Sequence, residues 1–148
     1  MASTLTPTPF NIKITEEQVV RNTIVKSEVT YTISNVTNVD RRVVTCPNTT
    51  SIDLFNVNGI NPGAGTFPSS SLQYVRITNL DDTYSIAVTL SGSQGKLTQE
   101  VVPSSTIMLA SSNITSSAFN GSFGDDIEYV LAYAISGSVD VEYTIVNA

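Results

Sequence analysis

The sequence predicts an all-β protein, an antiparallel β-sandwich of jelly-roll-like or Ig-like outline with about eight to ten strands. Three observations predict this fold. Apolar and polar residues alternate with period two along much of the chain, tracts rich in Gly, Pro, Asn and Ser separate the alternating stretches, and no segment makes a convincing helix. The 148 residues suffice for one domain with a real core. We expect an extended N-terminal arm over residues 1–9 and a single sandwich domain over residues 10–148.

The first third of the chain predicts short strands separated by turns. Residues 1–9 are small and polar with two prolines, which favour extended backbone; they form either a disordered terminus or a segment that orders on a partner. A first strand is predicted from Phe10. Residues 15–18 (TEEQ) resemble a helix N-cap, but β-branched residues follow, so a short turn is expected there. A second strand or strand pair follows over residues 24–33, then a turn-rich tract over residues 34–42 and a short extended piece at residues 43–45.

The middle of the chain carries a Gly-rich tract and the clearest alternation. A strand at residues 52–54 leads into a Gly- and Pro-rich tract, residues 55–71, which lacks both phosphate-loop spacings and is expected to be a loop. Apolar residues then alternate over residues 72–79 and 86–90 on either side of the turn NLDDT. The tract SGSQG predicts a hairpin connection, and Pro103 should end the strand that follows it. A short strand is expected at residues 107–109.

The C-terminal residues predict a hairpin of two long strands, because two alternating runs flank Ser136-Gly137-Ser138. In the second run the apolar face is formed by Val139, Val141, Tyr143 and Ile145. In the first run, the apolar face expected toward the core is formed by Ile127, Tyr129, Leu131, Tyr133 and Ile135.

The composition offers little that could catalyse a reaction. The chain has no histidine, which excludes every His-based triad and metal site. Asp81 and Asp82 lie in a predicted turn, where Asp side chains bind backbone amides. A weak calcium site from Asp125 and Asp126 is the alternative to a purely structural role for the second acidic cluster, which ends at Glu128. We expect no enzyme, no cofactor and no metal.

Charge and cysteine content restrict the partners. The formal net charge is −6 and the seven basic side chains are scattered, whereas nucleic-acid binding needs a basic stripe. The single cysteine, Cys46, has no partner for an intrachain disulfide and is expected to be an inert residue near a strand end; the alternative is an intermolecular bridge. The N-terminus shows no export-signal pattern, and no apolar run is long enough to cross a membrane. We expect synthesis in a cytoplasm and no contact with nucleic acid or membrane.

The segment GAGTFPSSSLQYVRITNLDDTYSIAVTL, followed by VPSSTIML, resembles small structural proteins of tailed bacteriophages, particularly those of marine cyanophages. The resemblance covers residues 52–109. It implies a non-enzymatic virion protein, most simply a capsid decoration (cement) protein on the capsid exterior, made in the host cytoplasm. It also implies the major capsid protein or other virion proteins as partners, and a homotrimer. The alternative is a tail or fibre accessory domain that binds a receptor or glycan.

A decoration protein would add buried interface on the outer capsid where several subunits meet, and so oppose separation of those subunits. The extended, uncharged segment ahead of the first strand is the expected contact. The residues predicted to bind the partner are Thr6, Pro7, Thr8, Pro9 and Phe10.

Overall fold

The computed structural model describes residues 6–57, 66–67, 72–92, 95–110 and 127–148. Every regular element among them is a β-strand, which confirms the all-β prediction. The chain divides into two compact units, one ending at Asn38 and one spanning Val39–Asn147. The boundary expected from the sequence lies much earlier, at residue 9, and each unit is described by itself below.

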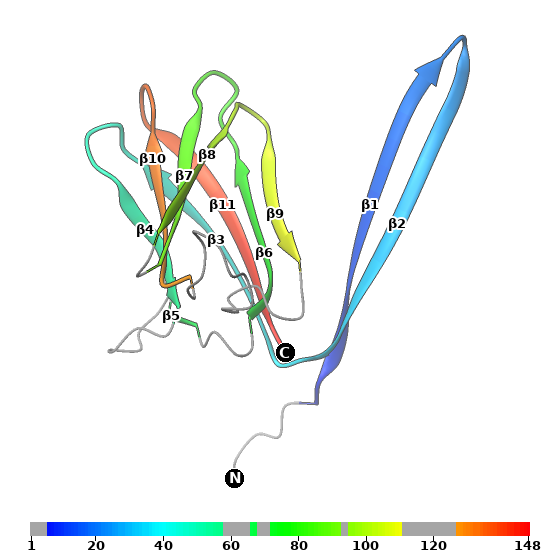
Figure 1. Cartoon of the computed structure of the whole chain (residues 1–148), viewed down its shortest axis with the longest axis horizontal. Coiled ribbons are helices and arrows are strands. Elements are labelled where there is room, and N and C mark those ends of the chain that lie inside the picture. Colours follow the sequence, from blue (N-terminus) through cyan, green and yellow to red (C-terminus); the bar gives the residue numbers. More distant parts are fainter. Residues whose placement is uncertain (1–5, 58–65, 68–71, 93–94, 111–126) are drawn as a thin grey trace. The chain divides into compact units, whose positions relative to one another are not determined.

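The first unit contains a long two-stranded hairpin. From here on we call this hairpin, residues 8–36, the arm; it is not the segment of residues 1–9 for which the sequence predicted an extended arm. Its strands β1 (Thr8–Val20) and β2 (Thr23–Val36) pair antiparallel along almost their whole length (Figure 1, blue to cyan). Arg21 and Asn22 form the two-residue turn between them, with φ of 49° and 62°. Positive φ at both positions is typical of a type I′ turn, whose twist matches that of the strands, and Asn tolerates this conformation.

The turn predicted at residues 15–18 is wrong, because these residues lie inside β1 and pair with residues 25–28 of β2. β-Branched residues on both strands favour extended backbone over the whole stretch, and the turn lies at Arg21 and Asn22 instead. The turns predicted over residues 34–42 are also largely wrong. β2 continues to Val36 through a register shift near Asn35, whose φ is 58°, and a new strand begins at Asn38.

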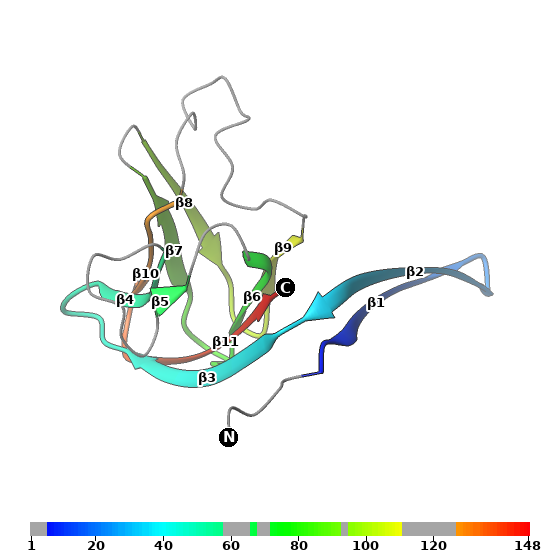
Figure 2. The same cartoon turned by 90° about the horizontal axis from the view of Figure 1, so that it is seen from below.

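The second unit is a β-sandwich of a five-stranded and a four-stranded sheet (Figures 1 and 2). The strand order is β5-β4-β10-β7-β8 in the first sheet and β3-β11-β6-β9 in the second. β4 and β5 pair in parallel, whereas β10 pairs antiparallel with both β4 and β7. The strands are β3 (Asn38–Cys46), β4 (Ile52–Val57), β5 (Thr66–Phe67), β6 (Leu72–Asn79), β7 (Ile86–Ser91), β8 (Lys96–Val101), β9 (Thr106–Ala110), β10 (Tyr129–Ala134) and β11 (Val139–Asn147).

The predicted C-terminal hairpin is wrong. β10 and β11 are consecutive along the chain, but β10 lies in the five-stranded sheet and β11 in the four-stranded sheet. β6 and β7 are separated in the same way, whereas β7 and β8 form the predicted hairpin. A period-two pattern shows that a strand has one buried face, and that requirement is met equally well in either layer of a sandwich.

The connection between β10 and β11 depends on Gly137. Its φ is +78°, and an added Cβ would lie 2.7 Å from a ring carbon of Tyr84. Glycine is therefore required twice here, for the left-handed backbone and for the close approach of the aromatic ring.

The core lies between the two sheets and is built from alternating residues of both. Val75 and Ile77 of β6, Ile86 and Val88 of β7, and the predicted face of β11 are all buried in it. Phe55 and Tyr143 meet across it with ring centroids 5.8 Å apart. The predicted face of β10 is wrong: Val130, Ala132 and Ala134 are buried, while Tyr129, Tyr133 and Ile135 are exposed.

Candidate interaction surface

The register of the arm divides its side chains between two faces of opposite character. Cross-strand partners point to the same side, and neighbours along a strand point to opposite sides. One side carries large exposed apolar side chains, with exposed fractions between 37% and 58%. We call the exposed part of this side the apolar face and define it by Ile14, Val20, Val25, Val29 and Tyr31. Ile12 and Ile33 lie on the same side nearer the open end of the hairpin and are buried. Glu16 is the one charged side chain that the register places among them.

The other side, which we call the polar face, carries most of the charged and hydroxyl side chains of the arm, together with exposed Val19 and Ile24 next to the turn. The Lys13 ammonium lies 2.9 Å from the Glu28 carboxylate, and the Thr32 hydroxyl donates to Asn11 Oδ1 at 2.7 Å. Glu17 stands directly opposite Lys26 in the register. Cross-strand pairs of this kind stabilise a sheet surface that faces water.

Every residue of Lys13–Val20 and Thr23–Thr32 is exposed. A two-stranded hairpin with no third strand and no covering layer is only marginally stable in water. Burying one of the large apolar side chains of the apolar face would contribute about 1.5–3 kcal/mol. The outer edges of β1 and β2 also present unpaired backbone groups, which are a template for further pairing. The arm therefore has the properties of a segment that is completed by contact with other protein.

The apolar face includes a shallow hollow near its middle. Glu16, Gln18, Val25 and Ser27 line it together with Glu17. The small Ser27 side chain leaves room there between the larger residues at either end of the face. A side chain from a partner could insert at this point.

The predicted partner-binding residues lie at the start of this same element. Thr6 and Pro7 are exposed ahead of β1, and Thr8 and Pro9 are exposed at its beginning, while Phe10 is half-buried. The register places Phe10 on the same side as the apolar face. Sequence reasoning missed the larger surface beyond these five residues. Two β-branched runs joined by Arg21-Asn22 were the available signal, since a two-residue turn containing Asn is typical of hairpins.

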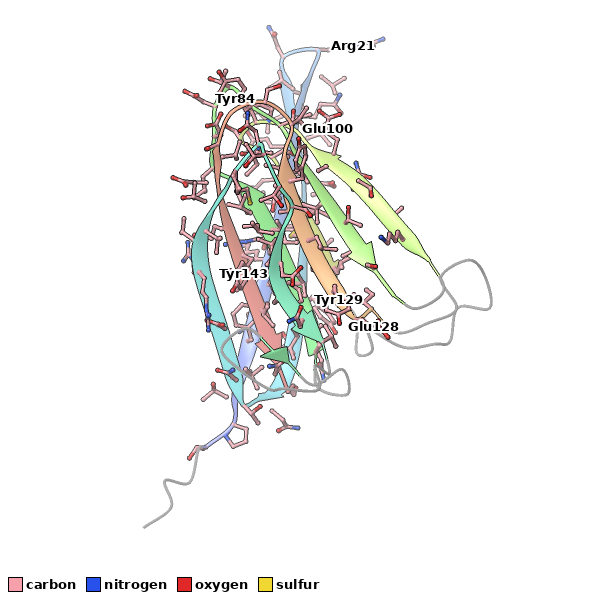
Figure 3. The ribbon with its side chains drawn as sticks, turned by 90° about the vertical axis from the view of Figure 1, so that its left-hand side faces the viewer. Arg21, Tyr84, Glu100, Glu128, Tyr129 and Tyr143 are labelled. Carbon is pink, nitrogen blue, oxygen red and sulfur yellow. The ribbon has the colours of Figure 1, made fainter. Side chains whose placement is uncertain are left out.

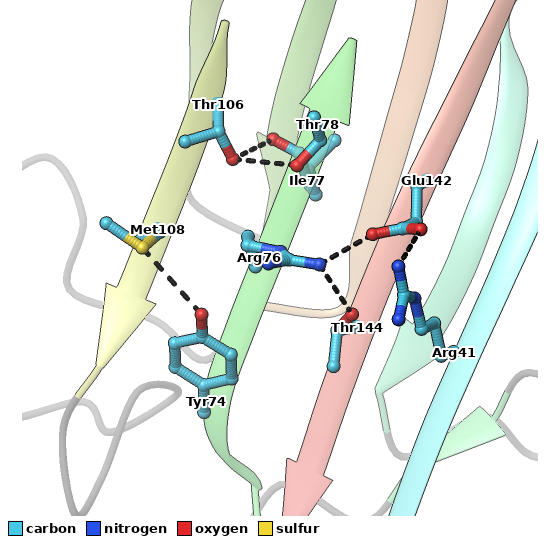
Figure 4. Close-up of polar contacts among 9 residues, drawn as sticks. All are labelled: Arg41, Tyr74, Arg76, Ile77, Thr78, Thr106, Met108, Glu142 and Thr144. Carbon is cyan, nitrogen blue, oxygen red and sulfur yellow. Dashed lines mark hydrogen bonds and ion pairs between the residues drawn. The ribbon is translucent and has the colours of Figure 1, made fainter. Parts of the chain in front are cut away.

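A cluster of charged and hydroxyl side chains lies on the four-stranded sheet (Figure 4). The Glu142 carboxylate receives hydrogen bonds at 2.5 Å from both Arg41 and Arg76, and Arg76 also contacts the Thr144 hydroxyl at 3.4 Å. The hydrogen bond from Arg41, followed by the charges of both guanidinium groups, lowers the pKa of Glu142, against the opposing effect of desolvation. This cluster ties β3, β11 and β6 together and has the character of a structural ion-pair network.

Among the carboxylates considered for catalysis, Asp81 lies in the described part of the chain and has a structural role. Asp81 Oδ1 accepts hydrogen bonds from the backbone N–H groups of Thr83 and Tyr84 at 2.7 and 2.6 Å, which confirms its predicted role in the turn. The buried Asn79 amide reinforces the same loop by donating to the carbonyl oxygens of Tyr84 and Val101. Asp125 and Asp126 lie outside the described residues. Within the described ranges, no group of three or more acidic or Cys side chains is placed to hold a metal ion.

Cys46 is fully buried, and burial, followed by the charge of Asp140, raises the pKa of its thiol to about 11. The thiolate is the reactive form of cysteine. The folded chain therefore keeps this thiol protonated and shielded, in agreement with its predicted inert role.

Two tyrosines are exposed on β10 in the five-stranded sheet. Tyr129 is 44% exposed and Tyr133 is 39% exposed, whereas Tyr143 on β11 is buried. Figure 3 labels Tyr129 and Tyr143 on their strands. The Tyr133 hydroxyl donates to the Asn48 carbonyl at 2.9 Å, which holds its ring in place. Fixed and partly exposed aromatic rings are the kind of surface on which sugar rings or apolar groups stack.

Comparison of the chain with protein-family models, curated proteins and solved structures returned no match. Among the described residues there is no helix of the length and hydropathy needed to span a membrane. The choice of a candidate site therefore rests on the geometry alone, and the arm is the strongest candidate.

Proposed function

We propose that this chain is a non-enzymatic structural protein of a tailed-phage particle, and that it acts as a decoration protein bound to the outer capsid surface. The observation that carries the proposal is the apolar face of the arm, whose large side chains are 37–58% exposed. Such a surface is completed by protein contact. The resemblance of residues 52–109 to phage structural proteins supports the choice of a virion as the setting.

The two units would serve different purposes in this role. The sandwich has a packed core, and the arm supplies an additional contact surface. A specific interface buries about 1,200–2,000 Å² in total, and an arm contact combined with contacts of residues 6–10 would approach this range. Such contacts, made to capsid subunits or to neighbouring copies of the chain bound on them, would oppose separation of the subunits.

The test is incorporation into particles. Antibodies raised against the purified chain should label the heads of phage particles produced from a genome that encodes it, as seen by immunogold electron microscopy. Particles that assemble with the full chain should carry it, while particles made with the double variant Val25→Asp/Val29→Asp should carry at least about tenfold less. The matched control Ile24→Asp/Thr30→Asp places the same charges on the polar face and should be incorporated normally. Absence of the full chain from purified particles would refute the proposal.

The alternative function is a tail or fibre accessory domain that binds a receptor or glycan. The exposed rings of Tyr129 and Tyr133 favour it, because carbohydrate recognition uses aromatic platforms. A glycan array probed with the chain would show binding that is lost in Tyr129→Ala/Tyr133→Ala. Labelling of tails rather than heads in the immunogold experiment would favour this alternative.

A further inference from the structure

We propose that the apolar face of the arm packs against the same face of a second copy of this chain, so that the protein associates with itself through its arms. This inference rests on the proposed function, since it names the occupant of the surface assigned there to protein contact. It concerns Ile14, Val20, Val25, Val29 and Tyr31, the residues that define the apolar face.

The distribution of charge favours a second copy. The arm carries three basic and three acidic side chains and is neutral, so the whole formal charge of −6 lies on the rest of the chain. Two copies repel each other through their remaining residues, and the arm is the segment they can bring together without that cost. A partner with a strongly charged surface would be expected to select complementary charge on the arm. The arm has no excess charge of either sign, so a second neutral arm can approach it without net repulsion.

The dimensions of the arm suit a modest interface between two copies. Each face spans about ten residues per strand, or roughly 30 Å by 10 Å for two strands. Covering one face on each of two copies buries on the order of 1,000 Å² in total, close to the lower end for specific contacts. We therefore expect reversible association with a dissociation constant of about 1–100 μM.

Glu16 restricts how two arms can be arranged. It is the single charge on the apolar face, and like charges placed opposite each other across an interface are unfavourable. An arrangement that superposes the two Glu16 carboxylates is disfavoured, whereas arms that run in opposite directions with an offset separate them.

Site-specific cross-linking tests the proposal directly, because the chain has one cysteine and it is buried. The variants Val25→Cys and Val29→Cys place a thiol on the apolar face, and Ile24→Cys and Thr30→Cys place one on the polar face at the adjacent position. A short bis-maleimide reagent should join two copies of the apolar-face variants at micromolar chain concentration. The polar-face variants should give at least about fivefold less cross-linked product.

Sedimentation equilibrium supplies an independent measurement. The full chain should show reversible association, and Val25→Asp/Val29→Asp should raise the dissociation constant at least about 100-fold. Ile24→Asp/Thr30→Asp should change it less than about threefold.

Two results would overturn the inference: a chain that stays monomeric at concentrations of hundreds of micromolar, or equal cross-linking from both faces. A monomer whose particle incorporation still depends on Val25 and Val29 would remove the second copy but leave the proposed function standing. If the chain associates reversibly but is absent from particles, the association of two copies stands and the proposed function is refuted.

Discussion

Two regions of this molecule use the same residues in the same pattern with opposite outcomes. Val25 and Val29 of the arm are 55% and 58% exposed, while Val75 and Val141 of the sandwich are 2% and 0% exposed. All four valines stand in strands whose side chains alternate between two faces. The sandwich provides a second layer for its apolar faces, whereas the two-stranded sheet of the arm contains no second layer of its own. Alternation therefore predicts that a strand has an apolar face, and the partner of that face decides whether it is a core or an interface.

The largest expected difference concerns truncation of apolar side chains. Ile77→Ala removes a core side chain that is 1% exposed and should lower the free energy of unfolding by about 2–5 kcal/mol. Val29→Ala in the arm should change it by less than about 0.5 kcal/mol at concentrations where the chain is monomeric. Urea unfolding followed by circular dichroism measures both. Similar costs would contradict the exposure of Val29 in the single chain.

The two regions should also differ in the rate at which their thiols react. The rise in the Cys46 pKa from 9.0 to about 11 lowers the thiolate fraction at pH 8 about 100-fold. In Val25→Cys, the arm thiol should react with a disulfide reagent at the rate of a free cysteine. Cys46 should react at least about 100-fold more slowly until urea unfolds the sandwich. Rapid reaction of Cys46 in the folded chain would contradict its burial.

The ion pairs of the two regions should also differ in strength. Glu142→Gln leaves Arg41 and Arg76 without their carboxylate and should cost about 1–3 kcal/mol. Glu28→Gln breaks the exposed arm pair with Lys13 and should cost about 0–1 kcal/mol. Unfolding in urea separates the two values, and equal costs would show that the Glu142 network is no stronger than a surface pair.

The same network predicts a pH dependence. Because its arginine partners lower the pKa of Glu142 below the ordinary value of 4.5, its contribution is present above that value. The contribution is lost as pH falls through the lowered folded-state pKa. The wild-type chain should therefore lose more stability between pH 5 and pH 2 than Glu142→Gln does, at about constant ionic strength. Parallel acid titrations of the two proteins would contradict this assignment.

Positions with positive φ show a smaller contrast. Gly137→Ala forces a side chain into left-handed backbone beside the Tyr84 ring and should cost about 1–2 kcal/mol of sandwich stability. The melting temperature reports this change. Val139→Ala is an unsuitable control because it empties the core, whereas the exposed Ser136→Ala tests the same connection without strain.

The smallest expected effect is in the turn of the arm. Asn22→Gly relieves the residual strain of a φ of 62° and should stabilise the hairpin by a few tenths of a kcal/mol. Amide hydrogen exchange in β1 and β2 should slow slightly, with no change in the strands of the sandwich. Faster exchange in the arm would contradict the type I′ assignment of this turn.

Several features of the fold followed from the sequence alone. The buried faces of β6, β7 and β11 are those that their alternation predicts, because side chains in a strand point alternately to two sides. Pro103 ends β8 as expected, and Asp81 binds the backbone of its own turn. These features depend on residues close together in the chain, so local pattern is sufficient to determine them.

Other features were decided only by the tertiary structure. β10 offers two plausible faces, and packing selected the small Val130, Ala132 and Ala134 for the core over the larger Tyr129 and Tyr133. Neither the placement of β10 and β11 in different sheets nor the exposure of the apolar side chains at residues 13–32 can be predicted from alternation. Strand pairing joins residues that are distant in the chain, and period two specifies that a face is apolar without specifying which layer will cover it.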